Sequence, residues 1–212
     1  MKNNFTKKLT RQPGKKRKAM QKILELDRVL TGKIRIKDEN NKLFRIAAFL
    51  SHTGDSWFWC SGLFIIWLFA HGTLQKTVAF WGIAIAVTAV FIFLLKRMIH
   101  RKRPEGNWGD IYRKTDPHSF PSGHAVRAGL ILVLAMNTFH FPFMIFFILW
   151  AILMILSRVI TGVHFLLDVT AGIFLGLLIG IGWIAVMPYL FEMFYFLFDR
   201  SLWPGILERL FN

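Results

Sequence analysis

The chain has 212 residues, 54% of them hydrophobic, with 22 Phe and 8 Trp, and its formal net charge is +15. This apolar content exceeds that of an ordinary soluble domain of the same length and indicates a single membrane domain. The single cysteine, Cys60, excludes an intrachain disulfide and a cysteine-based zinc site.

A basic arm, residues 1–50, comes first. Of the 27 Lys and Arg residues, 15 lie between Lys2 and Arg45, before the first long apolar segment. Residues 2–18 contain almost no large apolar side chains, which predicts disorder. The apolar spacing in residues 19–36 predicts an amphipathic helix, either at the bilayer surface or packed against the protein's own loops. We expect the arm to meet a bilayer with anionic lipids, and not nucleic acid.

Five charge-poor segments follow within residues 51–212, which we expect to form the membrane domain. They cover residues 56–75, 77–95, 122 to about 139, about 143 to 158, and 169–191, with a turn at His140 to Pro142. The sequence therefore predicts an all-α integral membrane helical bundle of about five transmembrane helices. The small residues of the last segment predict close helix packing; they are Gly172, Gly176, Gly180 and Gly182.

Five spans would put the arm, residues 96–121 and residues 158–168 on one side of the membrane. That side would carry 24 of the basic residues, and the opposite side would carry 3. The positive-inside rule then places the N-terminus and the loop-rich face in the cytoplasm. A phosphate-binding site would place Lys and Arg on its side of the membrane in either orientation. The orientation is therefore inferred mainly from the basic residues of the arm, which lie outside that site.

Polar clusters lie at the ends of these segments, all on the same side. Lys96 and Arg103 are seven residues apart, which is two turns along one helix face, so both can address one anion. Ser122 and Gly123 open a helix, where free backbone N–H groups and the helix dipole favour a phosphate.

The third cluster contains Arg158, His164 and Asp168. His164 and Asp168 are four residues apart and are expected to share a helix face, where the carboxylate can hold one imidazole nitrogen protonated. Each cluster by itself has an ordinary explanation. Consecutive Lys and Arg residues after a span commonly mark membrane topology, and Pro-Ser-Gly commonly starts a helix. An isolated His and Asp pair is more often a structural contact. Ionisable groups that converge at span ends indicate a functional site.

The spacing Lys96-x6-Arg103-Pro104, Pro121-Ser122-Gly123-His124 and Ser157-Arg158-x5-His164-x3-Asp168 resembles the three-part signature of the type 2 phosphatidic acid phosphatase superfamily. This superfamily also includes glucose 6-phosphatase and the vanadium haloperoxidases. The resemblance covers residues 51–182. The stretch from Arg101 to Ala128 is most similar to the presqualene and polyisoprenoid diphosphate phosphatases.

The resemblance implies roles for the signature residues. His164 would be the nucleophile that forms a phosphohistidine, Asp168 would orient it, and His124 would be the general acid. The phosphate oxygens would be held by Lys96, Arg103, Ser122, Gly123 and Arg158. Lys96, Arg103 and Arg158 would supply the positive charge that metal ions supply in other phosphatases, so we expect neither a metal nor another cofactor.

The segment 105–120 joins two of the clusters. Trp108, Tyr112, Arg113 and Lys114 could form a lid over the headgroup, and a solvated connector is the alternative. The remaining histidines of the spans and loops are predicted to be interfacial or packing residues: His52, His71, His100 and His140.

The leading hypothesis is a membrane lipid phosphatase that hydrolyses phosphatidic acid, phosphatidylglycerophosphate or a polyprenyl diphosphate. A phosphotransferase that passes the same phosphohistidine phosphate to another lipid or sugar is the second hypothesis, and a noncatalytic membrane scaffold is the third. A haloperoxidase is disfavoured, because those enzymes are soluble.

Overall fold

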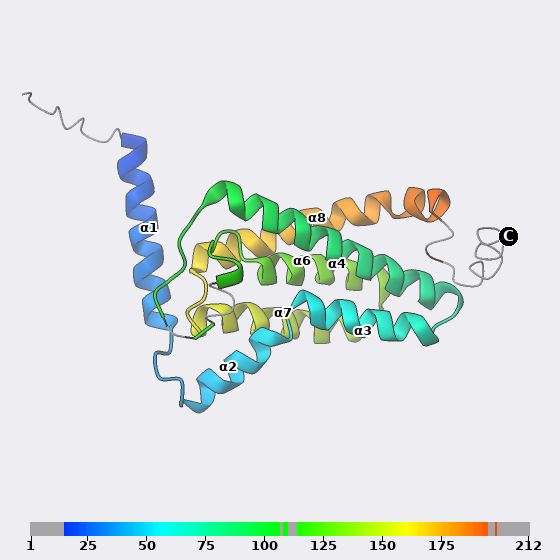
Figure 1. Ribbon diagram of the computed structural model, residues 1–212, viewed down its shortest axis with the longest axis horizontal. Coiled ribbons are helices and arrows are strands. Elements are labelled where there is room, and N and C mark those ends of the chain that lie inside the picture. The colour runs from blue at the N-terminus through cyan, green and yellow to red at the C-terminus, as the bar shows by residue number, and fades with distance from the viewer. Residues whose placement is uncertain (1–14, 107, 110–113, 195–197, 199–212) are drawn as a thin grey trace, which may run out of the picture.

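A computed structural model describes residues 15–106, 108, 109, 114–194 and 198 of the chain (Figure 1). The helices are α1 (Lys15–Ile34), α2 (Lys42–His52), α3 (Ser56–Phe69), α4 (Gly72–Ile99), α6 (Gly123–Thr138), α7 (Phe143–Ile160) and α8 (Leu166–Met193). Among these described residues, the β-type pairing is limited to an isolated bridge between Lys102 and His118. The prediction of an all-α fold is confirmed.

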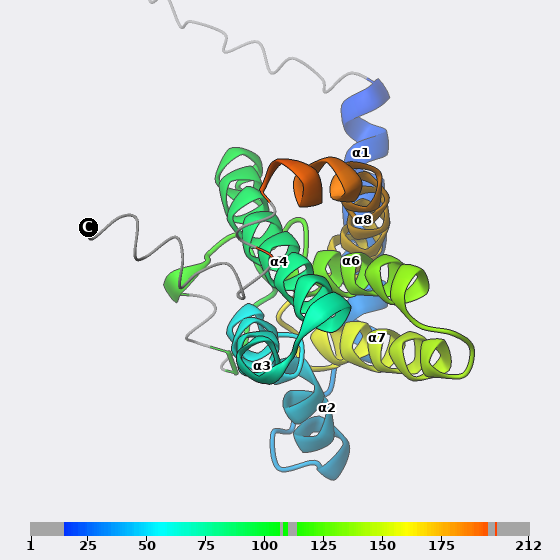
Figure 2. The same cartoon turned by 90° about the vertical axis from the view of Figure 1, so that its right-hand side faces the viewer.

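The bundle consists of α3, α4, α6, α7 and α8, which run in alternating directions (Figures 1 and 2). Three of them, α4, α7 and α8, are long and apolar enough to cross a bilayer, whereas α3 has 14 residues and α6 has 16. Large apolar side chains such as Phe91, Phe146 and Phe174 are exposed on the outside of the bundle. Exposed apolar side chains of this size suit contact with lipid.

The boundary between α3 and α4, the first two helices of the bundle, differs from the prediction. The first span was expected to reach residue 75, but α3 ends at Phe69 and residues 72–75 begin α4. Gly72 has a φ of +60°, a left-handed conformation that glycine adopts without steric cost, and it turns the chain here. The turn therefore lies at residues 70–72.

The closest helix pair is α6 against α8. A Cβ atom added at Gly172 would lie 2.8 Å from the carbonyl oxygen of Ser122 and 2.8 Å from Cβ of Ala125. Gly172 therefore lets the start of α8 lie against the start of α6. The packing prediction is wrong for Gly182, because a Cβ there would meet nothing within 4 Å.

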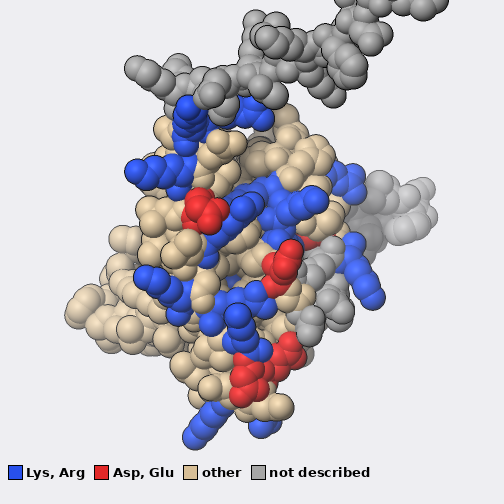
Figure 3. Space-filling view, turned by 90° about the vertical axis from the view of Figure 1, so that its left-hand side faces the viewer, with Lys and Arg blue, Asp and Glu red and all other residues tan. Residues whose placement is uncertain are grey.

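The hydrophobic core lies in the half of the bundle away from the N-terminal arm. It is formed by α3, α4 and α6, with Phe80, Ile85, Leu130 and Leu134 among its most buried side chains. The other half of the bundle contains smaller apolar clusters and most of the buried charged side chains, such as Lys96, Arg158 and Asp168. Lys and Arg side chains gather over its end face (Figure 3). The connection 161–165 and the described parts of the connection between α4 and α6 lie at this end, together with α1 and α2 (Figure 1).

The N-terminal arm contains two helices within its described part. The predicted disorder of residues 2–18 lies outside the described residues up to residue 14, and residues 15–18 belong to α1, which begins at Lys15. α1 lies across the end of the bundle, almost perpendicular to the other helices (Figure 1). α2 packs against α7 and crosses residue 50, the predicted domain boundary.

Candidate active site

His164 lies in the connection between α7 and α8. The N–H groups of Val163 and His164 both donate to the carbonyl oxygen of Arg158, which folds the connection back on the end of α7. Nδ1 of His164 lies 3.6 Å from Oδ2 of Asp168. Sequence spacing predicted that these two residues share a helix face, but α8 begins at Leu166. The connection, and not a helix turn, therefore brings the imidazole to the carboxylate.

The carboxylate of Asp168 is fixed from two sides. Its Oδ2 atom accepts a hydrogen bond of 2.9 Å from the N–H of Phe165, and its Oδ1 atom accepts one of 2.6 Å from Arg101. His164 is 1% exposed and Asp168 is fully buried. Asp168 therefore faces the Nδ1 side of the imidazole at ion-pair distance, although Nδ1 makes no hydrogen bond among the described residues, and Nε2 faces Arg103.

The charge state of His164 follows from its surroundings. Burial lowers the pKa of His164 well below its ordinary value of 6.5, and the positive charges of Arg103, Arg158 and Lys96 lower it further. The imidazole is therefore neutral at physiological pH. A neutral imidazole has a lone pair, which a nucleophile requires.

Lys96 and Arg103 reach the site by different routes. Sequence spacing predicted one helix face for both, but α4 ends at Ile99 and His100 has a left-handed φ of 52°. Lys96 belongs to the last turns of α4, and Arg103 follows in the extended segment after it. Nη1 of Arg103 lies 3.0 Å from Nε2 of His164.

Arg158 is fully buried at the end of α7 and donates a hydrogen bond to Oγ of Ser51 in α2. Together with Lys96 and Arg103 it lines the same cavity. Buried cations are costly unless they have anionic partners. Lys96, Arg103, Arg127 and Arg158 line the cavity against two carboxylates, Asp55 and Asp116, so positive charge is in excess there and suits a polyanionic ligand.

The second histidine enters from α6. Ser122 is the N-cap of this helix, and its Oγ atom accepts a hydrogen bond of 3.4 Å from the N–H of Ala125. His124 follows within the first turn, and its Nε2 atom lies 2.9 Å from Oδ1 of Asp55. The N–H of Ser122 donates to the carbonyl oxygen of Asp168, so the starts of α6 and α8 are joined.

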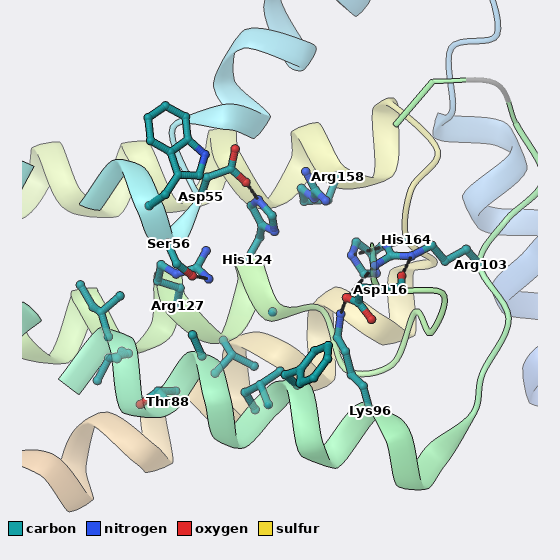
Figure 4. A pocket seen from close by; sticks show the side chains of 18 residues that line it. Asp55, Ser56, Thr88, Lys96, Arg103, Asp116, His124, Arg127, Arg158 and His164 are labelled. Atoms are coloured by element: carbon teal, nitrogen blue, oxygen red, sulfur yellow. Dashed lines mark hydrogen bonds and ion pairs between the residues drawn. The ribbon is translucent and has the colours of Figure 1, made fainter. Parts of the chain in front are cut away.

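A cavity of about 280 Å³ brings these groups together (Figure 4). Its polar wall is formed by Lys96, Arg103, Gly123, His124, Arg158 and His164. Both histidines thus open onto one space. Ser122 and Asp168 lie behind this wall; Ser122 caps α6, and its predicted contact with phosphate stays a prediction.

The structure adds residues that the sequence analysis did not single out. Asp116, from segment 105–120, forms ion pairs with Lys96 and Arg103, the latter at 2.9 Å. Asp55 also lines the cavity, and Arg127 holds the turn that carries it by donating to the carbonyl oxygen of Gly54. The position of Asp55, an acidic residue directly before an apolar segment, is the signal that could have indicated it.

The predicted lid is described only in part. Trp108 packs on α2, with its ring centroid 5.9 Å from those of Phe44 and His52. Lys114 is exposed, and Tyr112 and Arg113 lie outside the described residues. Within the described part of this segment, Asp116 is the side chain that reaches the cavity. His52, predicted to be an interfacial or packing residue, has its Nδ1 atom 3.2 Å from Oδ2 of Asp55.

Comparison with known proteins addresses the identity of this bundle. The model of the PAP2 superfamily matches residues 77–192, more than half of the chain. LpxE of Aquifex aeolicus, a crystal structure, is similar with a TM-score of 0.59 and 26% identity over 76% of this chain and 94% of LpxE. A transmembrane PAP2 type phosphatidylglycerolphosphate phosphatase from Bacillus subtilis shares the fold, with a TM-score of 0.64 and 24% identity over 80% of this chain and 88% of that one.

The matched region contains the helices and connections that carry all three polar clusters. The specific branch within the superfamily stays a prediction. Because the family match and the structural neighbours agree with a cavity that suits a phosphate group, we conclude that the chain is a membrane phosphatase of the PAP2 superfamily.

Proposed function

We propose that this phosphatase hydrolyses a lipid phosphate or diphosphate through a phosphohistidine on His164, without a metal ion. The observation that carries the proposal is the position of His164. Its Nδ1 atom faces Asp168, and its Nε2 atom lies on the side of Arg103, in a cavity with three further cations, Lys96, Arg127 and Arg158. This arrangement suits a nucleophile that attacks a phosphoryl group.

In the first step, the lone pair of Nε2 attacks phosphorus and the bond to the leaving oxygen breaks. The imidazole then carries a positive charge, which the carboxylate of Asp168 stabilises. Lys96, Arg103 and Arg158 neutralise charge on the phosphoryl oxygens. Gly123, the first residue of α6, also lines the cavity, so we assign its N–H and the positive end of the helix to the same group.

His124 supplies the proton for the leaving oxygen in this first step. In the second step, His124 takes a proton from water as the water oxygen attacks phosphorus, the P–N bond breaks, and inorganic phosphate is released. Asp55, at 2.9 Å from Nε2 of His124, orients this imidazole and stabilises it when it is protonated.

A lipid substrate is supported by the apolar part of the cavity. Ile85, Ile92 and Phe93 of α4 line it beside the cations, and the outside of the bundle is apolar. The Bacillus subtilis neighbour is described as a phosphatidylglycerolphosphate phosphatase. Phosphatidic acid, phosphatidylglycerophosphate and polyprenyl diphosphates each combine a phosphate with an apolar tail, so each is a candidate substrate.

The experiment is phosphate release from these lipids by the purified protein in detergent, without an added acceptor. His164→Ala should lower the rate by at least about a hundredfold, because the nucleophile is lost. His140→Ala is the matched control, since His140 is exposed in the turn at the other end of the bundle. Full activity of His164→Ala would contradict the proposal, and phosphate transfer only to an added acceptor would favour a transferase.

We further propose that the active site faces the cytoplasm. The proposal is supported by the basic residues of α1, which lie at the same end of the bundle as the cavity (Figure 3). A cysteine introduced by Trp108→Cys in a Cys60→Ala background tests it. A reagent that does not cross membranes should label this cysteine in opened cells and not in intact ones; labelling in intact cells would reverse the orientation.

A further inference from the structure

α1 is attached to the start of α8, the helix that carries Asp168. The N–H of Leu167 donates a hydrogen bond of 3.0 Å to Oδ1 of Asp27, and the N–H of Leu166 donates one of 3.1 Å to Oγ1 of Thr31. The first N–H groups of a helix have no partner within that helix. Asp27 and Thr31 are 4% and 2% exposed. α1 therefore supplies buried caps to α8 from outside the region that matches the family, residues 77–192.

Arg101 links the same aspartate to the catalytic carboxylate. Its Nη2 atom donates to Oδ2 of Asp27 and its Nη1 atom donates to Oδ1 of Asp168, both at 2.6 Å. The guanidinium group also lies over the ring of Phe165, 4.5 Å from its centroid. A continuous chain of contacts thus runs from Asp27 through Arg101 and Asp168 to Nδ1 of His164, 3.6 Å from Asp168.

The charges of this chain of contacts decide what Asp27 does. A guanidinium paired with Asp168 alone would cancel the negative charge of that carboxylate. Because Asp27 shares the guanidinium, the three groups together carry one net negative charge. A buried negative charge beside His164 stabilises the positive charge that the imidazole acquires when it attacks phosphorus.

We propose that Asp27 is a positioning residue for phosphoryl transfer: it holds Arg101 and preserves the negative charge of Asp168 that supports His164. This inference rests on the proposed role of His164 as the nucleophile. Asp27 does not line the catalytic cavity, so it acts on the transition state through Arg101 and leaves the binding of the substrate phosphate unchanged.

The alternative is a purely structural role, in which Asp27 only attaches α1 to α8. Thr31 provides the matched comparison, because it lies one turn further along the same buried face of α1. It accepts a hydrogen bond from the adjacent N–H group of α8 and has no charge. Loss of Thr31 therefore weakens the attachment and leaves the charges around Asp168 unchanged.

The experiment compares Asp27→Asn, Asp27→Glu and Thr31→Val in the phosphate-release assay. Asp27→Asn should lower kcat at least about tenfold with KM within about twofold, because only the transition state loses stabilisation. Thr31→Val should keep kcat within about threefold of the wild type. Asp27→Glu restores the charge and should recover part of the loss.

Equal losses in Asp27→Asn and Thr31→Val, or wild-type kcat in Asp27→Asn, would overturn the proposal. If Asp27→Asn does not fold, Asp27→Ser takes its place, because it also removes the charge and keeps a hydroxyl that can accept a hydrogen bond: a kcat at least about tenfold below that of Thr31→Val supports the charge role, and equal values contradict it. His164→Ala, measured in parallel, tests the proposed nucleophile separately from the proposed role of Asp27. Activity in that variant refutes the proposed nucleophile, whereas its inactivity beside an active Asp27→Asn refutes only the role of Asp27.

Discussion

Nε2 of His124 lies 2.9 Å from Oδ1 of Asp55, so the proposed general acid rests against a buried carboxylate. The two residues are far apart in the sequence and meet where α6 passes the turn before α3. A carboxylate in this position stabilises the imidazolium form by its opposite charge and fixes the orientation of the ring. The pair gives the leaving-group side of the cavity the same kind of support that Asp168 gives to His164.

Asp55→Asn should therefore slow the hydrolysis of natural lipid phosphates. We expect kcat to fall about 10-fold to 100-fold, less than the roughly 100-fold to 10,000-fold that general acid catalysis itself contributes, because Asp55 supports the acid and His124 remains. The alcohol released from a lipid is a poor leaving group and needs the proton. Hydrolysis of p-nitrophenyl phosphate, whose leaving group needs little protonation, should fall much less.

Asp38→Asn is the control for this substitution, because Asp38 is an exposed carboxylate in the connection before α2. It should leave both substrates at the wild-type rate. An equal loss of both activities in Asp55→Asn would contradict a role in proton transfer and would point to a structural role.

Asp116 forms ion pairs with Lys96 and Arg103, two of the cations assigned to phosphate. A phosphate analogue must compete with this carboxylate. In Asp116→Asn, inhibition by vanadate should become about tenfold tighter, which corresponds to about 1.4 kcal/mol. Glu105→Gln, at an exposed position in the same segment, should leave inhibition unchanged. Weaker inhibition in Asp116→Asn would show that the carboxylate organises the cations instead of competing for them.

The lowered pKa of His164 has a measurable consequence. The side chain stays unprotonated as the pH falls through 6.5, because its pKa in the folded protein lies well below that value. Imidazole nitrogen NMR signals of labelled protein should therefore include one that does not titrate between about pH 7.5 and pH 6. The signal is assigned by its loss in His164→Ala, and a midpoint near 6.5 for this signal would refute the prediction.

The proposal of metal-free catalysis predicts that excess EDTA leaves phosphate release unchanged. The positive field at the substrate is assigned to Lys96, Arg103 and Arg158, and a chelator does not remove side chains. Activity is measured after dialysis against EDTA, with and without added magnesium. Loss of activity that magnesium restores would overturn this part of the mechanism.

Substitution of two glycines of α8 by alanine should change the stability of the protein in opposite directions. Gly172→Ala should destabilise the protein by about 1–3 kcal/mol, because the added Cβ lies 2.8 Å from the carbonyl oxygen of Ser122 and the two helices must separate. Gly182→Ala meets no neighbour, so it should stabilise the helix by roughly 0.5–1 kcal/mol. Thermal unfolding in detergent measures both, and equal midpoints would contradict the contact.

Sequence periodicity predicted the helices well because each apolar segment has the length and composition of a span. Residues 143–158 and 169–191 correspond closely to α7 and α8. The boundaries that failed were set by backbone geometry. Gly72 turns the chain early, and His100 ends α4 before Arg103, so the assumption of a continuous helix was wrong there.

The sequence predicted the positions of the cavity residues less accurately than the positions of the helices. The signature indicated which side chains to consider, and the structure gathers Lys96, His124 and His164 at one cavity. Asp27 and Asp116 gave no such signal, because each is a single carboxylate whose partner is distant in the sequence, and the place of Asp55 before an apolar segment did not indicate its partner His124. Only the packing of the helices determines contacts of this kind.

The hydrogen bond of 3.0 Å from the N–H of Ser122 to the carbonyl oxygen of Asp168 restricts how this enzyme can adapt. It joins the first turns of α6 and α8, and Gly172 holds the same two turns in contact. The proposed proton donor, His124, and the proposed support of the nucleophile, Asp168, thus lie on two helix starts that are joined to each other. Substrates with different headgroups would then be accommodated by other parts of the cavity wall, α4 and residues 55–57 at the start of α3. Evolution of new specificity in such a chain would be concentrated in those two parts.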